Sequence, residues 1–239
     1  MKPENQVPPL DVALTLLGRL LEYPGPGFTE LLDQAVAVAG GADLEGFRFI
    51  QMALTLDQRE ELYTGTFDVN PCCVPYLSIH LFGEENFKRG EFMAALNREY
   101  VARGFDAGSE LPDHLGTVLR HAATLEDPER RELVVFCILG PLDRLLGALP
   151  EDHPYGRVLA AAGRVLRAAY PGIEAALSPL EEMRRHGVCP SVAAGCCGPA
   201  DEPAVVSAIV DGPEDEDALT PSYSEATHAV SFNPTLQPS

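Results

Sequence analysis

The densest group of side chains that could do chemistry lies in one short segment, Glu110-Leu111-Pro112-Asp113-His114-Leu115. A carboxylate beside an imidazole can transfer protons, and such a pair buried in a closed pocket would indicate an enzyme. The segment also lies where a loop is expected to become a helix, and the free backbone N–H groups of a helix start favour an acidic cap. On this pattern Asp113 and His114 would line the rim of an exposed helix start without bonding each other.

A second group combines aromatic, acidic and thiol side chains between residues 63 and 76. Tyr63, Phe67 and Tyr76 fit either an apolar core or a binding surface, and Asp68 adds a carboxylate beside them. The adjacent thiols Cys72 and Cys73 could sense redox state, although a disulfide between neighbouring residues closes a strained ring.

The third group lies near the C-terminal end, where His186 and Cys189 are followed by Cys196 and Cys197. These donors would suit zinc or an iron–sulfur cluster, but the spacing lacks the paired Cys-x-x-Cys knuckles of such sites. The two adjacent cysteine pairs, together with Cys137 in an apolar run, differ from a secreted disulfide framework and favour free thiols. We predict neither metal nor cofactor, and a cysteine-based metal- or redox-binding helical module remains the alternative.

Motif and charge patterns narrow the functional classes. The sequence contains no phosphate-binding glycine loop, no dinucleotide fingerprint, no Gly-x-Ser-x-Gly elbow and no His-Glu-x-x-His, so we predict that the protein is not an enzyme. A formal charge of −19 and a pI near 4.5 would repel nucleic acid and attract basic peptides. The same charge also serves solubility.

Helices must position these groups. Apolar residues recur at helical spacing from residue 8 to residue 187, and no segment alternates long enough to predict a strand. An apolar run at 133–139 indicates a central buried helix, and Asp57 with Glu60 has the form of a capping box. Helices are expected at 10–22, 28–39, 43–53, from 57, at 85–103, from 112, from 127, from 154 and at 173–186. The fold class is therefore all-α, a single compact domain of about ten helices over residues 1–188.

The remaining residues, 189–239, form a different kind of segment. They carry eight acidic residues, many prolines and no Lys or Arg, which is typical of disorder, although the apolar run 204–210 could dock on the body or a partner. The first residues lack the pattern of a signal peptide, and no apolar stretch approaches the roughly 20 residues of a membrane helix. We expect a cytoplasmic protein without stable membrane insertion.

The central region resembles the NarJ-type assembly chaperones of nitrate reductases, within the TorD/DmsD group of redox-enzyme maturation proteins. The similarity spans roughly residues 10 to 185. The order and spacing of the shared motifs also agree with that group. The matching segments are Tyr63-Thr64-Gly65-Thr66-Phe67-Asp68, then Tyr76-Leu77-Ser78-Ile79-His80-Leu81-Phe82-Gly83-Glu84, Arg89-Gly90, and Glu110-Leu111-Pro112-Asp113-His114-Leu115.

This resemblance implies an all-helical protein that binds the N-terminal peptide of a molybdopterin oxidoreductase catalytic subunit. Binding would delay membrane docking or export until the molybdenum cofactor is inserted, and the chaperone would be a monomer or weak dimer. Cys72 and Cys73 stand where family members more often have polar or basic residues, so the client could be a nitrate, selenate, chlorate or hydrocarbon-oxidising enzyme. The candidate client-binding residues in the matching segments are Tyr63, Phe67, Asp68, Tyr76, Glu110, Pro112, Asp113 and His114.

Overall fold

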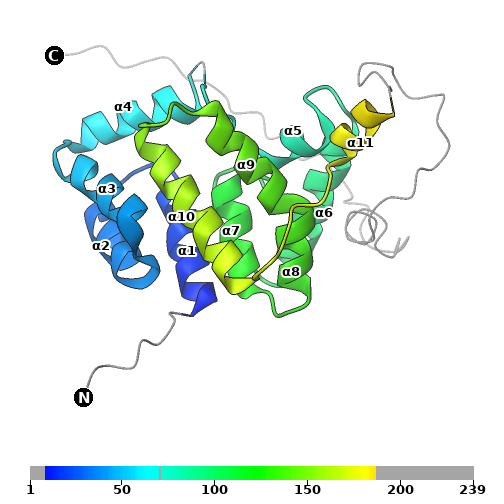
Figure 1. Ribbon diagram of the computed structural model, residues 1–239, viewed down its shortest axis with the longest axis horizontal. Coiled ribbons are helices and arrows are strands. Elements are labelled where there is room, and N and C mark those ends of the chain that lie inside the picture. Colours follow the sequence, from blue (N-terminus) through cyan, green and yellow to red (C-terminus); the bar gives the residue numbers. More distant parts are fainter. Residues whose placement is uncertain (1–8, 70, 187–239) are drawn as a thin grey trace, which may run out of the picture.

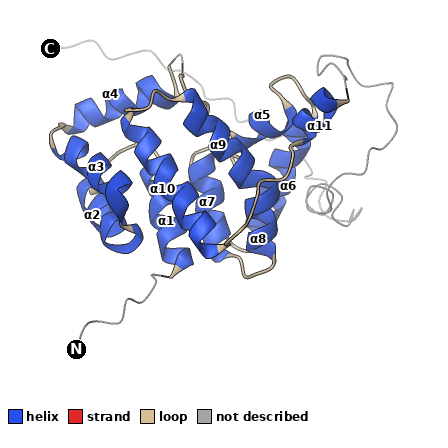
Figure 2. Cartoon of the chain, viewed as in Figure 1, coloured by secondary structure: helices blue, strands red, loops and turns tan. Residues whose placement is uncertain are grey.

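The computed structural model describes residues 9–69 and 71–186, so the predictions for the acidic tail 189–239 and its cysteines lie outside the described residues. All regular secondary structure in the described part is helical, which confirms the all-α fold class (Figures 1 and 2). The elements are α1 (Leu10–Leu20), α2 (Phe28–Ala39), α3 (Gly41–Met52), α4 (Leu56–Phe67), α5 (Leu77–Phe82), α6 (Lys88–Ala102), α7 (Leu115–Thr124), α8 (Glu129–Leu133), the π-helical turn η1 (Val134–Ile138), α9 (Leu139–Ala148), α10 (Pro154–Ala169) and α11 (Pro179–Arg185).

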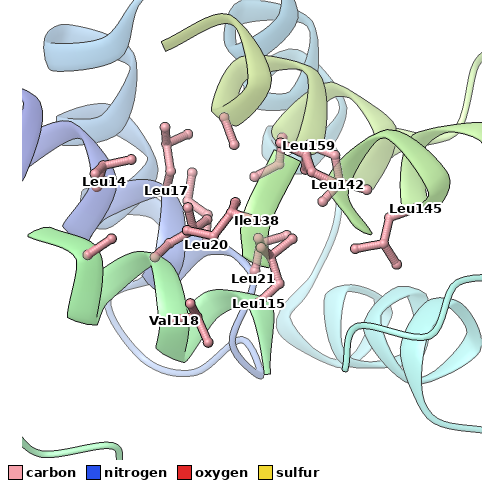
Figure 3. Packing of buried hydrophobic residues seen from close by; sticks show 14 of the residues in the cluster. Leu14, Leu17, Leu20, Leu21, Leu115, Val118, Ile138, Leu142, Leu145 and Leu159 are labelled. Atoms are coloured by element: carbon pink, nitrogen blue, oxygen red, sulfur yellow. The ribbon is translucent and has the colours of Figure 1, made fainter. Parts of the chain in front are cut away.

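The core is built around α1, which packs against α7, α2 and α10. Its leucine stripe is completely removed from solvent at Leu14, Leu17 and Leu20. Figure 3 shows this stripe facing Leu115 and Val118 of α7 and, on another side, aliphatic residues of η1, α9 and α10. Burial of each such side chain contributes about 2 kcal/mol, so the stripe fixes the position of α1 and of the loop that follows it.

Two glycines allow α1 and α7 to approach closely. A Cβ atom added at Gly18 would lie 2.5 Å from the carbonyl oxygen of Gly116, and one added at Gly116 would lie 2.6 Å from the carbonyl oxygen of Gly18. Real Cβ atoms do not make contacts this short with backbone. The absence of side chains at both positions therefore sets the distance between the two helices.

Several helix boundaries follow the prediction. α2 occupies 28–39 as expected, and α10 begins at Pro154, where the fixed φ of proline suits a first helical position. The apolar run 133–139 lies in a largely buried helical segment, although its middle is the π-helical turn η1 rather than regular α-helix.

Other boundaries were predicted wrongly. The capping box of α4 uses Thr55 and Gln58, not Asp57 and Glu60: the Gln58 N–H donates to the Thr55 hydroxyl at 3.3 Å, and the Gln58 side chain accepts from the Thr55 N–H at 2.9 Å. The extended backbone of Thr55 makes it the cap, because a capping residue must lie just outside the helical conformation. α7 likewise begins at Leu115 rather than at Pro112.

Two short helices depart furthest from the predictions. α5 was not predicted, and the expected helix at 173–186 is confined to Pro179–Arg185. The segment before α11 crosses the body instead, where the Ala176 N–H donates to the Val135 carbonyl of η1 at 3.0 Å. No helix within the described ranges is long and apolar enough to span a membrane.

Candidate functional site

An isolated antiparallel bridge between Tyr76 and His114 joins the starts of α5 and α7. The Leu77 N–H donates to the Asp113 carbonyl and the Leu115 N–H donates to the Pro75 carbonyl, both at 2.9 Å. This pairing places the segment around Tyr76 beside the segment around His114, although more than thirty residues separate them in the sequence. The loop residues on either side of the bridge therefore have fixed positions.

Asp113 lies at this junction and is fully buried. Its Oδ2 accepts from the Ser78 N–H at 3.2 Å and from the Ser78 hydroxyl at 2.5 Å, and the Arg89 Nε donates to the same hydroxyl at 3.1 Å. Asp113 therefore caps the first turn of α5, not the helix that follows it in sequence. The prediction that it lies at an exposed helix start is wrong, because the bridge turns its side chain toward α5.

His114 is also buried, with 1% of its surface exposed, so the prediction of a rim histidine is wrong as well. It is the N-cap of α7, where its Nδ1 accepts from the Gly116 N–H at 3.1 Å. Burial lowers its pKa to about 4, and the nearby charge of Arg120 acts in the same direction. The ring is therefore neutral, which the cap requires, because a protonated Nδ1 cannot accept a hydrogen bond.

An enzyme built on this pair would need a substrate to reach both side chains. Asp113 and His114 have different partners, Ser78 and Gly116, and each is almost completely enclosed. The arrangement favours a structural role in shaping the neighbouring surface over acid–base catalysis.

The buried histidines predict a pH dependence of folding. Burial also lowers the pKa of His121, to about 4, and its ring lies 4.7 Å from that of Tyr100. Because the unfolded chain binds these protons at ordinary histidine pKa values, stability is full above about pH 6.5 and declines as the pH falls toward 4. At about pH 5 we expect each of these two histidines to have lowered the free energy of unfolding by about 2 kcal/mol. Urea denaturation at pH 7 and pH 5 measures the loss.

His121→Phe provides the control for this prediction. Phenylalanine keeps an aromatic ring beside Tyr100 and Phe105 but does not titrate, and Nδ1 of His121 has no hydrogen-bond partner to lose in the described structure. The variant should lose the part of the pH dependence that comes from His121, while the lowered pKa values of His80, His114 and His153 keep the rest. Glu22 and Glu110 act oppositely, because their raised pKa values favour the folded state as the pH falls. An unchanged pH dependence in His121→Phe would contradict the assignment.

Three other predicted residues lie beneath the surface. Phe67 packs its ring 5.1 Å from that of Tyr63 and 4.8 Å from that of Tyr155. Pro112 is buried, and its carbonyl accepts from the Tyr100 hydroxyl at 2.7 Å. Tyr63 is 5% exposed, so these side chains support a binding surface from below rather than form its outer layer.

Carboxylates and tyrosines form the outer layer above them. Tyr23 is 52% exposed and packs its ring 5.3 Å from that of Tyr63. Its pKa is raised by partial burial and by the charge of Glu60. The pKa of Tyr76 is raised by burial and by the charges of Glu110, Asp113 and Asp68. We call this surface the acidic aromatic face; its residues are Glu22, Tyr23, Glu60, Asp68, Tyr76 and Glu110.

Sequence reasoning found half of this face. Asp68, Tyr76 and Glu110 were predicted, whereas Glu22, Tyr23 and Glu60 were not. Glu22 and Tyr23 were interpreted only as the end of a helix, since the prolines and glycines after them dominate that segment. The available signal was an aromatic residue that directly follows a carboxylate at a helix end.

A pocket of about 280 Å³ opens at one edge of the face. It is lined by Glu22, Tyr23, residues 106–110 and Arg120. Arg120 lies against Glu22, with 2.6 Å between its Nε and the Glu22 Oε1, and its guanidinium stacks over Phe105 at 5.3 Å. The pocket is therefore strongly polar and lies between the end of α1 and the start of α7.

The described cysteines are free thiols. Cys72 is exposed, whereas Cys73 and Cys137 are buried, and burial raises the pKa of each buried thiol to about 12. Within residues 9–69 and 71–186, no three His, Cys, Asp or Glu side chains are arranged to hold a metal ion. The cysteines that the sequence suggested for a metal site, Cys189, Cys196 and Cys197, lie outside this part of the chain.

The comparisons with known proteins agree with the motifs. No curated protein matches the chain in a sequence search. Residues 29–135 match the profile of the nitrate reductase delta subunit, and this range contains all eight predicted site residues together with Glu60, but not Glu22 or Tyr23. Residues 29–135 are thus similar to the nitrate reductase delta subunit family, in agreement with the motif resemblance.

Proposed function

We propose that this protein is a cytoplasmic assembly chaperone that binds the N-terminal segment of a nitrate reductase catalytic subunit. Binding would hold the client until its molybdenum cofactor is inserted and before it docks at the membrane. The family match over residues 29–135 supports a role in nitrate reductase maturation. The acidic aromatic face, which includes Asp68, Tyr76 and Glu110 from the segments that carry the family resemblance, is the observation on which the proposal depends.

The chemistry of this face suits an amphipathic basic segment. Tyr23 of this face is 52% exposed, and Leu111, which follows Glu110 in sequence, is 47% exposed, so each offers apolar surface to a partner. Four carboxylates lie on the same face, and they would attract a client of opposite charge and fix its orientation. A helix laid into such a surface would bury its apolar side against the aromatics and direct its basic residues to the carboxylates.

The predicted residues divide into two roles in this proposal. Asp68, Tyr76 and Glu110 would contact the client directly. A second group would hold the surface in shape from beneath; its members are Tyr63, Phe67, Pro112, Asp113 and His114. Substitutions in the second group should therefore reduce stability and binding together, whereas those in the first should reduce binding alone.

Salt provides the first test. If the carboxylates steer the client, the association rate of a synthetic peptide from the N-terminal segment of the catalytic subunit should fall about tenfold between about 50 mM and about 500 mM salt. The dissociation rate should change less, because it depends on apolar contact. Stopped-flow fluorescence with a labelled peptide measures both rates.

A matched pair of substitutions distinguishes the charge of this face from the net charge of the whole protein. Asp68→Asn and Glu174→Asn each remove one negative charge from an exposed position, but Glu174 follows the end of α10 that is remote from α4. Only Asp68→Asn should slow association and weaken its salt dependence. An association rate that is indifferent to salt, or equal effects of the two substitutions, would argue against steering by this face.

A further inference from the structure

The pocket beside the acidic aromatic face has an unbalanced charge. Three carboxylate residues contribute to its lining, Glu22, Asp106 and Glu110, against a single cation, Arg120. Its volume of about 280 Å³ lies near the lower end for ligand pockets and suits one long side chain better than a large molecule. It therefore has the charge and size to accept one organic cation.

Arg120 is already committed to other partners. It forms an ion pair with Glu22, and its two terminal nitrogens donate to the carbonyl oxygens of Asp106 at 3.0 Å and Ala107 at 2.8 Å. Its guanidinium plane also covers the ring of Phe105. Arg120 thus holds the pocket wall together and is not available to neutralise Glu110.

Glu110 is the carboxylate left without a charge partner. It is half-buried, and it forms no ion pair with any residue in the described part of the chain. Burial raises its pKa, and repulsion from Glu22 and Asp68 raises it further. A cation placed between these groups would relieve both effects.

An aromatic ring completes the cation environment. Tyr23 lines the pocket, and its ring makes an edge-to-face contact with that of Tyr63. Aromatic faces attract ammonium and guanidinium groups, and the attraction grows when the site is partly shielded from water. Because no described set of three His, Cys, Asp or Glu is arranged to hold a metal ion, the structure favours an organic cation over a metal.

We propose that this pocket receives one Arg or Lys side chain of the client segment, with Glu110 as its ion-pair partner and Tyr23 as its aromatic wall. This inference rests on the proposed function, and it adds that one basic position in the client is recognised specifically. Glu110 and Tyr23 belong to both the pocket and the acidic aromatic face, so a peptide on the face can place a side chain in the pocket.

A double-mutant cycle between the full-length protein and the synthetic catalytic-subunit peptide tests the pocket. Glu110→Gln should weaken binding of the peptide about tenfold, as measured by isothermal titration calorimetry. Each basic residue of the peptide is then replaced by glutamine in turn. One replacement should weaken binding to the wild-type protein about tenfold and have little effect on Glu110→Gln, because that pair is already lost.

Two controls define the result. Glu174→Gln makes the same chemical change at a remote exposed position and should bind the peptide like wild type. Tyr23→Leu keeps an apolar side chain but removes the aromatic ring. It should weaken peptide binding, and most of this loss should disappear when the same basic residue of the peptide is replaced by glutamine. Glu110→Gln should melt no lower than wild type, because the substitution removes repulsion from Glu22 and Asp68 rather than a favourable contact.

The outcomes separate the two proposals. If the wild-type protein binds the peptide but Glu110→Gln binds equally well, or if every basic position couples equally to Glu110, the pocket assignment is overturned and the chaperone proposal stands. If the wild-type protein binds no peptide from the catalytic subunit, both are overturned. Coupling to a single basic position establishes the pocket.

Discussion

Alanine at Gly116 is expected to lower the free energy of unfolding by about 3 kcal/mol, because it forces apart the two helices at the centre of the fold. The new Cβ would lie 2.6 Å from the Gly18 carbonyl oxygen, a backbone atom that cannot rotate away. Gly18→Ala should have a similar effect, since its Cβ would meet the Gly116 carbonyl at 2.5 Å and the Arg120 Cγ at 2.8 Å. Urea denaturation monitored by circular dichroism measures the loss.

Gly147→Ala is the matched control, because Gly147 also lies in a helix but a Cβ there would meet nothing within 4 Å. Alanine at this position should stabilise the protein by about 0.5 to 1 kcal/mol through its higher helix propensity. Equal effects at Gly116 and Gly147 would show that α1 and α7 can separate at little cost. Gly116 lies two residues after His114 and in the same helix as Arg120. Peptide binding should therefore weaken in Gly116→Ala and Gly18→Ala as well.

Asp113→Ala should cost about 3 kcal/mol, far more than an exposed helix cap would. The substitution leaves the Ser78 N–H and hydroxyl without their buried acceptor, and this hydroxyl is also the group to which Arg89 donates. Asp113→Asn should cost less, because the amide oxygen can still accept from Ser78, although the charge-assisted hydrogen bonds are lost. Chemical denaturation of both variants gives the values.

A cycle with Ser78→Ala tests the cause. If Asp113 acts through Ser78, the double variant should be less destabilised than the sum of the two single changes, since both remove the hydrogen bond from the Ser78 hydroxyl to Asp113. The bond from the Ser78 N–H is lost only when Asp113 is replaced. Peptide binding should fall in Asp113→Ala because Tyr76, next to α5, loses its fixed position opposite His114. Additive effects, or a loss below about 0.5 kcal/mol, would contradict this role.

The sequence by itself determined the helical class and much of the helix order. Apolar side chains at a spacing of three and four residues mark a buried stripe whatever the rest of the chain does, so Leu14 and Leu17 identified α1 correctly. Pro154 and the 28–39 segment likewise carry local signals that need no tertiary contact. α5 escaped prediction because its six residues are too few to show a period.

Only the tertiary structure decided what the polar residues do. An acidic side chain at a helix start normally caps its own helix, but Asp113 caps α5, because the Tyr76–His114 bridge places the N–H groups of that distant helix within its reach. The neighbours of Glu110 were also hidden, since Glu22 and Tyr23 line a pocket with it only when α1 packs on α7. Local periodicity reports which side of a helix is buried, whereas a long-range hydrogen bond or charge contact depends on the packing of elements far apart in sequence.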